Sequence, residues 1–216
     1  THDELTELLN RHEFETRLKR AVESIRIDST QHAVLYLDLD SFKVINDACG
    51  HEAGDAMLRE VAALLREHVR KHDAVARLGG DEFAILLEHC TRAQASAIAD
   101  KLCKAIEAHR FAWEDKFFNA GVSIGLVALL SPDSSAASVM KAADAACYAA
   151  KEMGRGRVYQ FDPDDAELNR HRQQVDSVAV INRALENDRF ELHAQPIRAT
   201  RSRPEAPSTH LEILVR

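Results

Sequence analysis

The stretch "ARLGGDEFAILLE" (residues 76–88) decides the fold around it, because it holds a turn between two runs of strand-forming residues. Gly79 and Gly80 tolerate the positive φ angles that tight turns require, so the stretch predicts a β-hairpin. The two acids that follow, Asp81 and Glu82, are more than a turn needs. They put two carboxylates at the tip of the hairpin, which makes this tip a candidate functional site.

A second pair of acids ends the apolar run "AVLYLDLD" (residues 33–40), which indicates a buried strand. If this strand neighbours the hairpin, its acids Asp38 and Asp40 meet those of the turn at one edge of a sheet. Clustered carboxylates repel one another and are costly to bury, and a divalent cation relieves both costs. Oxygen ligands of this kind suit Mg²⁺, which also binds substrate phosphates. For the hairpin acids alone, an acidic turn on a solvated surface is the simpler explanation.

Apolar periodicity predicts the other elements. Helices are expected at residues 55–70, 91–109 and 135–153, and strand signals cover residues 117–130 and 157–161. "GVSIG", from Gly121, matches the G-x-S-x-G pattern of hydrolases, but Ser123 lies inside strand-like sequence, so we reject that reading. The element order predicts an α/β fold with a mostly antiparallel central sheet flanked by helices.

Composition narrows the functional classes. The chain has 216 residues, 29% of them charged, and a net charge of −7, so no basic field indicates binding to a long nucleic acid. No apolar run is long enough to span a bilayer, and we expect membrane contact only through segments upstream of this sequence. The four cysteines are far apart and form no CxxC, which favours reduced thiols in the cytoplasm.

Three segments follow from the change in composition. Residues 1–161 form the predicted main domain, residues 162–175 begin a polar linker helix, and residues 176–216 hold two further strands joined by a loop. The last segment has too few apolar residues to form a domain by itself. We expect it to be the start of a truncated domain.

Several motifs in order carry a family resemblance. "RLGGDEF", "DLDSFKVINDACGHEAGDAML" and "DELTELLNR" resemble the GGDEF domain of bacterial diguanylate cyclases, over about residues 1–161. The resemblance implies a nucleotidyl-cyclase-like fold and a Mg²⁺-dependent enzyme, with Mn²⁺ as the other cation that could serve. It also implies that two GTP molecules become cyclic di-GMP with release of two pyrophosphates. Because each active site holds one GTP, the functional unit would be a homodimer.

The resemblance also implies roles for individual residues. Asp38, the carbonyl of Leu39 and Asp81 match the metal ligands, and Glu82 matches the acid that helps deprotonate the attacking 3′-hydroxyl. The remaining matches bind substrate. Asn46 and Asp55 read the guanine edge, and the hairpin glycines, Gly79 and Gly80, approach the phosphates. The side chains that lie beside the triphosphate are Phe42, Lys43, Lys151 and Arg155.

Most of these residues have a simpler explanation when taken singly. Lys151 and Arg155 near a helix C-terminus could only favour the helix dipole. Asn46 could end a helix, and Asp55 could cap one. Their occurrence together, in the family's order and spacing, favours the functional interpretation.

A second predicted site precedes the hairpin. "RKHD" contains Arg70-x-x-Asp73, which at this offset resembles the inhibitory site at which a cyclic di-GMP dimer restrains the cyclase. Arg70 can fork onto phosphate or guanine, and Asp73 can accept guanine N–H groups. The alternative is a solvated helix end with an Arg–Asp pair. We predict product inhibition. One departure from the family is Glu7, which stands where Gly is usual in the N-terminal motif.

The tail resembles the beginning of an EAL phosphodiesterase domain. "FELHAQPI" and "LEILVR" match two of its strands, so Gln195 and Arg216 would contact cyclic di-GMP and Glu212 would bind metal in a complete domain. We expect no phosphodiesterase activity from so short a piece. The alternative to a working cyclase is a regulatory module that binds GTP or cyclic di-GMP and tunes an attached phosphodiesterase. In either case we expect a cytoplasmic domain or the cytoplasmic part of a membrane-anchored sensor.

Overall fold

A computed structural model describes residues 1–28, 30–129, 134–162, 192–197 and 210–215. The chain divides into two compact units, Thr1–Asn169 and Arg170–Arg216. No helix in the described ranges is long and apolar enough to cross a bilayer.

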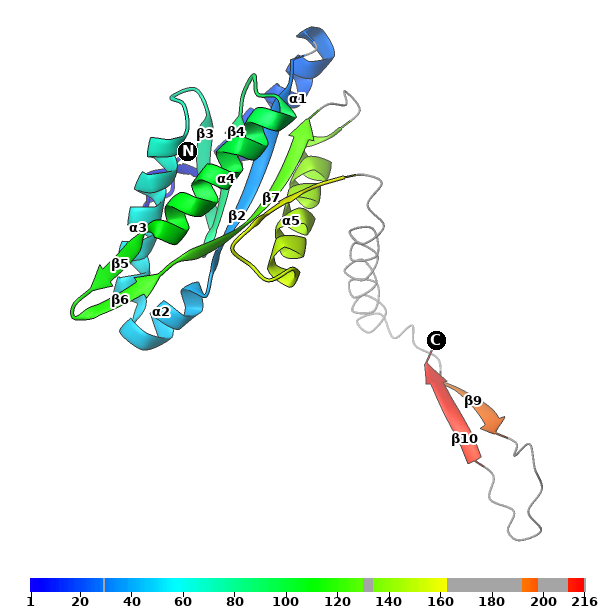
Figure 1. Cartoon of the computed structure of the whole chain (residues 1–216). Coiled ribbons are helices and arrows are strands. Elements are labelled where there is room, and N and C mark those ends of the chain that lie inside the picture. The colour runs from blue at the N-terminus through cyan, green and yellow to red at the C-terminus, as the bar shows by residue number, and fades with distance from the viewer. Residues whose placement is uncertain (29, 130–133, 163–191, 198–209, 216) are drawn as a thin grey trace, which may run out of the picture. The chain divides into compact units, whose positions relative to one another are not determined.

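The first unit is built on a six-stranded sheet (Figure 1). Its strands lie in the order β1 (Leu9–Asn10), β3 (Ala74–Gly79), β4 (Glu82–Leu87), β2 (His32–Asp40), β7 (Gly121–Leu129) and β8 (Val158–Gln160). The three inner ladders are antiparallel, whereas β1–β3 and β7–β8 are parallel. The sheet is therefore mixed, which corrects the expectation of a mostly antiparallel one. Parallel pairs arise here because helical crossovers return the chain to both edges.

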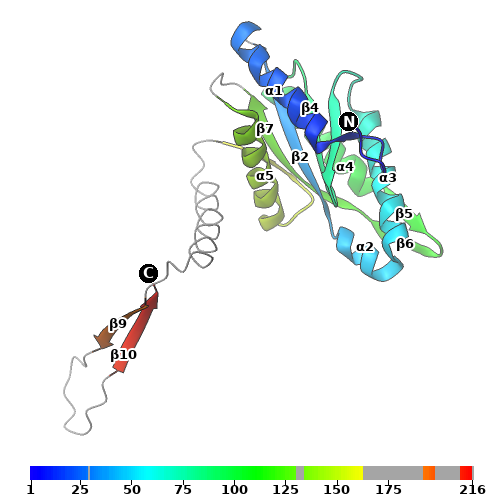
Figure 2. The same ribbon diagram turned by 180° about the vertical axis from the view of Figure 1, so that it is seen from behind.

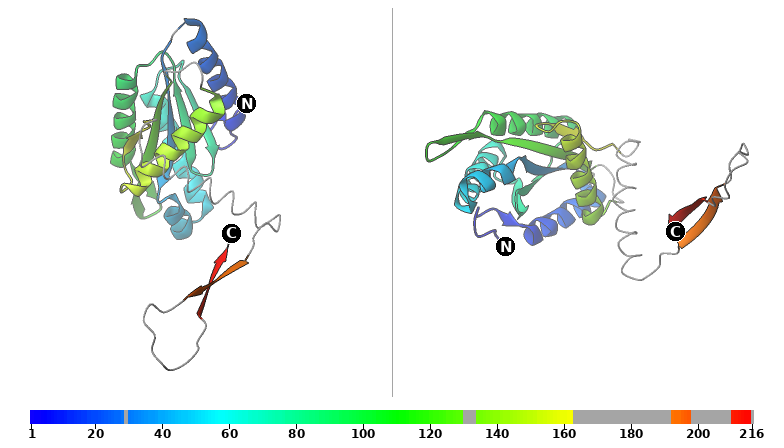
Figure 3. Two further views of the ribbon diagram at one scale, coloured as in Figure 1. Left: turned by 90° about the vertical axis from the view of Figure 1, so that its right-hand side faces the viewer. Right: turned by 90° about the horizontal axis from the view of Figure 1, so that it is seen from below.

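Two layers of helices cover the sheet. α3 (His51–His68) and α4 (Arg92–Ala108) lie on one face, and α1 (Arg11–Asp28) and α5 (Ala136–Glu152) lie on the other, as Figure 2 and the side view in Figure 3 show. Strand side chains alternate between the two cores. Leu35, Leu37 and Leu39 of β2 pack in the α3/α4 core, and Val34 and Tyr36 pack in the α1/α5 core.

This alternation orients the acids that end β2. Asp38 and Asp40 follow Tyr36 at intervals of two residues, so both lie on the face that α5 covers. A short helix, α2 (Phe42–Cys49), then leads away from the sheet edge into α3. The α5 face at the end of β2 is therefore where a site built from these acids has to be.

The remaining predicted elements are largely confirmed, with defined ends. Thr91 and Ser135 cap α4 and α5 with reciprocal side-chain hydrogen bonds, at the positions where helices were expected to begin. The strand signal over residues 117–130 is in fact two strands, because β6 (Lys116–Asn119) pairs with β5 (Arg110–Trp113) in a separate ribbon and β7 begins at Gly121. Ser123 lies inside β7, in agreement with the rejection of the hydrolase pattern.

Close contact between β7 and α5 depends on Gly125. A Cβ atom at this position would lie 2.1 Å from the Ala143 carbonyl oxygen and 2.3 Å from the Cys147 nitrogen. No side chain fits in that space, so the backbone of α5 lies directly against the strand. This contact sets the height at which the C-terminal end of α5 stands above the sheet.

The second unit contains an antiparallel pair, β9 (Leu192–Ile197) and β10 (His210–Val215), in which Gln195 lies opposite Glu212. Both strands were expected. Nearly all of the predicted linker helix and the predicted contact residue Arg216 lie outside the described residues. One strand pair does not establish the phosphodiesterase fragment, so that assignment is not supported at the level of the fold.

Candidate active site

The end of β2 and the tip of the Gly-Gly hairpin meet, as the sequence predicts. Asp38 lies directly opposite Glu82 in the β2–β4 ladder. One residue further, the amide of Leu39 donates to the carbonyl oxygen of Asp81 at 3.3 Å. Cross-strand partners of this kind have their Cβ atoms about 5 Å apart. The acids from the two sequence motifs therefore share one edge of the sheet.

Asp38 lies in an unfavourable electrostatic environment. Burial raises the pKa of its carboxyl group, and the negative charges of Asp81 and Glu82 act in the same direction, while the hydrogen bond and charge of Lys151 oppose them. The Asp38 Oδ2 and Lys151 Nζ atoms are 2.6 Å apart. Burial lowers the pKa of Lys151, but its pairing with Asp38 outweighs this and leaves the pKa raised. The ammonium group of Lys151 thus partly neutralises Asp38.

The donor set fits a hard divalent cation. In the described residues no three His, Cys, Asp or Glu side chains are arranged to hold a metal. The predicted set does not require three, since it consists of Asp38, Asp81 and the carbonyl oxygen of Leu39, and Mg²⁺ usually completes its shell with water and substrate phosphates. The repulsion that raises the pKa of Asp38 is the cost that such a cation would remove.

Asp40 is not part of this acidic cluster. Its Oδ1 atom accepts a hydrogen bond from the Ser123 hydroxyl at 2.8 Å, and its Oδ2 atom accepts one from the Gly156 amide at 3.0 Å. Both carboxylate oxygens therefore have partners within the protein. Of the two acids that end β2, only Asp38 faces the hairpin acids.

α2 and α3 bring the predicted guanine-reading residues together. Gly54 on α3 lies against Asn46 and Phe42 on α2, since a Cβ atom there would be 2.0 Å from Asn46 Oδ1 and 3.0 Å from Phe42 Cζ. Asp55 is the next residue on α3. Ser41 precedes α2 and has a left-handed φ of 63°. No side chain caps the helix, so the first backbone amides of α2, beside Lys43, can donate hydrogen bonds to a ligand.

The predicted phosphate contacts lie at the end of α5. Lys151 is in the last turn of the helix, and Arg155 follows in a turn where it has a left-handed φ of 59°. The Arg155 Nε atom is 4.0 Å from Asp40 Oδ1. Both basic residues therefore stand on the face of the sheet where β2 ends.

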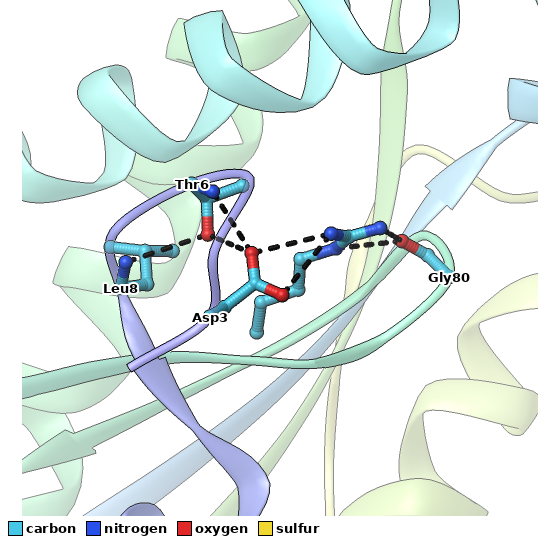
Figure 4. Close-up of polar contacts among 5 residues, drawn as sticks. Asp3, Thr6, Leu8 and Gly80 are labelled. Carbon is cyan, nitrogen blue, oxygen red and sulfur yellow. Dashed lines mark hydrogen bonds and ion pairs between the residues drawn. The ribbon is translucent and has the colours of Figure 1, made fainter. Parts of the chain in front are cut away.

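The N-terminal motif contacts the hairpin directly, which the sequence reasoning did not assign. Asp3 accepts hydrogen bonds from the amide and hydroxyl of Thr6 at 2.9 and 2.7 Å. Burial raises the pKa of Asp3, but these bonds and the charge of Arg77 outweigh it and hold the pKa below its usual value. Arg77 reaches from Asp3 to the Gly80 carbonyl oxygen at 2.8 Å, and Figure 4 shows this bridge. The motif thus braces the Gly-Gly turn.

Arg11 provides a second brace on the hairpin. Its Nε atom donates to the Leu78 carbonyl oxygen at 3.3 Å, and its NH2 atom is 3.5 Å from Glu82 Oε2. The signal for both braces was present in the sequence, because Asp3 and Arg11 belong to "DELTELLNR" and Arg77 precedes the glycines. Charge pairing between segments that far apart cannot be read from spacing alone.

At the predicted inhibitory site, Asp73 and Arg70 differ in availability. The Asp73 side chain is 3% exposed, and its oxygens accept hydrogen bonds from the Arg70 amide at 2.8 Å and the Glu88 amide at 3.2 Å. The Arg70 side chain is exposed and lines a cavity of about 300 Å³ whose other basic walls are Arg17, Arg66 and Lys71. Asp73 shapes the chain here, and the arginines and the lysine give the cavity its positive charge.

Comparisons with known proteins agree with this geometry. Residues 1–157 match the family described as "Diguanylate cyclase, GGDEF domain". The probable diguanylate cyclase DgcE of Escherichia coli is 42% identical over 172 residues, which are 80% of this chain and 16% of that protein. The bifunctional diguanylate cyclase/cyclic di-GMP phosphodiesterase MucR of Pseudomonas aeruginosa is 37% identical over 217 residues, which are 100% of this chain and 30% of that protein. The chain thus spans less than a third of the length of either relative.

A solved structure shows the same fold. The coiled coil and GGDEF domain of DgcB from Caulobacter crescentus, in complex with cyclic di-GMP, aligns with a TM-score of 0.70 at 31% identity, covering 74% of this chain and 85% of that one. The family match covers well over half of the 216 residues. Together with the meeting of β2 and the hairpin, this shows that the chain belongs to the GGDEF-domain family of diguanylate cyclases.

Proposed function

We propose that this chain is a Mg²⁺-dependent diguanylate cyclase that condenses two GTP molecules into cyclic di-GMP and releases two pyrophosphates. The observation that carries the proposal is the β2–β4 register, which puts Asp38 opposite Glu82 with Asp81 adjacent. Acids collected at a sheet edge, beside basic residues and an uncapped helix start, suit a metal-bound triphosphate.

The phosphate end of the site is built around Asp38. Asp38, Asp81 and the Leu39 carbonyl would hold Mg²⁺ or Mn²⁺, and the cation supplies charge neutralisation at the phosphates. Lys151, which pairs with Asp38 at 2.6 Å, and Arg155 would bind phosphate oxygens. Phe42 and Lys43 stand at the start of α2. Gly79 and Gly80, where an added Cβ atom would meet nothing within 4 Å, leave room for the triphosphate.

The guanine end is built on the α2–α3 pair. Asn46 and Asp55 offer an amide and a carboxylate, which match the mixture of acceptors and N–H donors on the guanine edge. Their approach depends on Gly54, which leaves no gap between the two helices. Because the two groups come from different helices, their spacing is fixed by packing rather than by a flexible loop.

Glu82 is the proposed base for the 3′-hydroxyl that attacks the α-phosphate. Its side chain is 34% exposed, so it can reach a nucleotide held by a second copy of the chain. Arg11, 3.5 Å from Glu82, holds the carboxylate at the tip of the hairpin. Each copy binds one GTP, and the condensation therefore requires two copies face to face.

We further propose product inhibition through the cavity at Arg70. The support is its lining, in which four Arg and Lys side chains outnumber the acids Glu7 and Asp73 and suit the phosphates of cyclic di-GMP. Asp73 contributes to this site mainly by holding the Arg70 and Glu88 amides. This differs from the role of guanine acceptor that the sequence resemblance implies for Asp73.

A regulatory module is the second candidate function. It is favoured by the bifunctional relative, whose similarity runs through the whole chain, tail included. For such a module the main domain would end at residue 161, and the β9–β10 pair would begin a phosphodiesterase domain. There Gln195 and Arg216 would contact cyclic di-GMP and Glu212 would bind metal.

Incubation with GTP and Mg²⁺, followed by chromatography for pyrophosphate and cyclic di-GMP, tests both proposals. The intact chain should form both products, at a rate that rises more than linearly with protein concentration as copies pair. Asp81→Ala should form neither. GTP binding without product, at concentrations where the chain is dimeric, would replace the cyclase with the regulatory module.

A further inference from the structure

The proposed function leaves one buried acid without a role. Asp40 is two residues from Asp38 on the same face, yet its side chain is 8% exposed and turned away from the hairpin acids toward Ser123 and Gly156. A buried carboxylate is retained only where donors compensate for its lost hydration. Here one donor is the Ser123 hydroxyl on the neighbouring strand β7, and the other is the Gly156 amide in the turn that follows α5.

That turn has an unusual backbone. Gly154, Arg155 and Gly156 all have positive φ angles, of 110°, 59° and 57°. The two glycines adopt them without strain, but Arg155 has a Cβ atom and does not. A conformation of this kind persists only when its surroundings hold it in place.

The hydrogen bonds of the turn divide into two sets. The Gly154 amide donates to the Lys151 carbonyl oxygen at 3.2 Å, and the Arg155 amide donates to that of Ala150 at 3.1 Å, so both tie the turn back to α5. The Gly156 amide donates to Asp40 instead and ties the turn to the sheet. One residue later the Arg157 carbonyl accepts from Ile124, where the chain rejoins β7.

Asp40 is itself fixed. Gly121 lies opposite it in the β2–β7 ladder, and a Cβ atom there would be 3.0 Å from Asp40 Oδ2, so the carboxylate fills the space that a side chain would occupy. Ser123, from the same strand, holds the other oxygen at 2.8 Å. The sheet therefore presents a rigid acceptor to the turn.

We propose that Asp40 is a positioning residue for the triphosphate of GTP. Its carboxylate fixes the 154–156 turn through the Gly156 amide and the Arg155 guanidinium, and so holds Arg155 and the end of α5 with Lys151 over the strand end where Asp38 lies. The inference rests on the proposed function, in which Lys151 and Arg155 bind phosphate. It adds that affinity for the phosphates, and not for the base, depends on Asp40.

The test separates phosphates from base by calorimetry with GTP, GMP and guanosine in the presence of Mg²⁺. Asp40→Ala should weaken GTP binding about tenfold, as expected for the loss of one charge-assisted hydrogen bond, and leave guanosine unchanged. Asp40→Asn should lose less than about threefold, because its oxygen still accepts from Gly156 and its amide can donate to Ser123. Asp100→Asn, on the exposed side of α4, is the control for net charge.

Two measurements make the result specific. Amide hydrogen exchange at Gly156 should accelerate in Asp40→Ala and stay slow in Asp100→Asn, which reports the turn without any nucleotide. In a chain that already carries Arg155→Ala, the further change Asp40→Ala should reduce GTP affinity less than it does in the intact chain, because the two residues act through one contact. If Asp40→Ala fails to fold, Ser123→Ala, which removes the hydrogen bond that holds the other carboxylate oxygen, should show the same two losses in smaller measure, and Asp40→Asn remains the conservative control.

Three outcomes overturn the inference: unchanged GTP affinity in Asp40→Ala, an equal loss of guanosine affinity, or unchanged exchange at Gly156. Failure of the intact chain to bind any guanine nucleotide would instead refute the proposed function, and with it the phosphate role of Asp40. In that case accelerated exchange at Gly156 would still show that Asp40 holds the turn, so the two failures are distinguishable.

Discussion

Asp38 and Asp73 are acids to which family resemblance gives a ligand role, and their side chains are only 14% and 3% exposed, but their surroundings differ. Asp73 accepts hydrogen bonds from two backbone amides of its own chain. Asp38 faces two other acids, and a single lysine partly compensates it. Asp73 therefore has its hydrogen-bond partners without any ligand, whereas Asp38 is kept ionised at an electrostatic cost that a cation would remove. This difference distinguishes an acid that builds the fold from one that binds.

The largest effect should come from Asp38→Asn. Removing the charge eliminates a proposed metal ligand, so formation of cyclic di-GMP should fall by about 10³-fold or more, as expected for the loss of a group essential to charge stabilisation. Stability should not fall, because the lost Lys151 pair is balanced by relief from burial and from Asp81 and Glu82. Chromatography and thermal unfolding give the two readouts. A marked drop in melting temperature would show that Asp38 is structural in the way Asp73 is.

Asp73→Ala should show the opposite pattern. It leaves the Arg70 and Glu88 amides without their acceptor, so the free energy of unfolding should fall by about 2–3 kcal/mol in urea titrations. Arg70→Ala, on an exposed side chain, should change stability by less than about 0.5 kcal/mol but relieve inhibition by cyclic di-GMP. Equal stability of the two variants would remove the distinction drawn between them.

Gly54→Ala tests the guanine end. The added methyl group would be 2.0 Å from Asn46 Oδ1, so Asn46 has to move. We expect affinity for guanosine to fall about tenfold, with a loss of stability of about 1–2 kcal/mol from the displaced α2. Calorimetry with guanosine provides the measurement, and Ala63→Gly, at an exposed position of the same helix, serves as a control for helix propensity. Unchanged guanosine affinity would argue against Asn46 as a base contact.

The pH at which these variants are compared matters because of His32. Its Nδ1 atom accepts from the His89 amide, and its Nε2 atom contacts Ser24 and Thr30. Burial lowers the pKa of His32, His89 acts in the same direction, and Glu88 opposes. The unfolded chain therefore binds a proton more readily, so stability is full above the usual value of 6.5 and falls as the pH drops through the folded pKa.

Urea titrations from pH 8 to pH 5 should show this decline, and His32→Gln should flatten it. Because the Glu88 amide is held by Asp73 and the neighbouring His89 amide by His32, acid also weakens the segment that Asp73 secures. A flat profile in the intact chain would show that His32 does not resist protonation.

The smallest effect should come from Glu7→Gly. Glu7 has a φ of 56°, which a residue with a Cβ atom adopts at a cost, and Gly removes that cost. We expect a gain of about 0.5–1 kcal/mol in the free energy of unfolding. Glu4→Gly, near it in the same segment, should bring no gain. A loss of stability in Glu7→Gly would mean that the side chain makes a contact worth more than the strain.

The sequence predicted the parts of the site that depend on strand register. "AVLYLDLD" and the Gly-Gly hairpin specify two buried strands, and pairing them brings their acids together whatever the rest of the chain does. Edge topology was less predictable, since the two-residue β1 and three-residue β8 carry no periodicity of their own. The parallel pairs they form depend on how the helices return, which is a tertiary property.

Long-range polar contacts were also beyond the sequence. Nothing in the spacing of Asp38 and Asp40 shows that one faces acids and the other a serine and a backbone amide. The bridge from Asp3 through Arg77 to Gly80 joins positions 74 residues apart at its first contact. Such contacts depend on the folded geometry. Glu7 shows that the reverse inference also fails, because it keeps a left-handed φ of 56° at a position where the family resemblance predicts Gly.

The contact between Gly125 and the backbone of α5 makes the phosphate end adjustable from a distance. Lys151 is in the last turn of α5, and the distance of α5 from the sheet depends on the absence of a side chain at Gly125. Any residue larger than glycine at position 125 would move α5 away from the strand and Lys151 away from Asp38, with no change in the charged side chains around them. If Lys151 binds phosphate as proposed, the affinity of this domain for phosphates therefore depends on a spacing that is set up to about two turns of helix before the lysine.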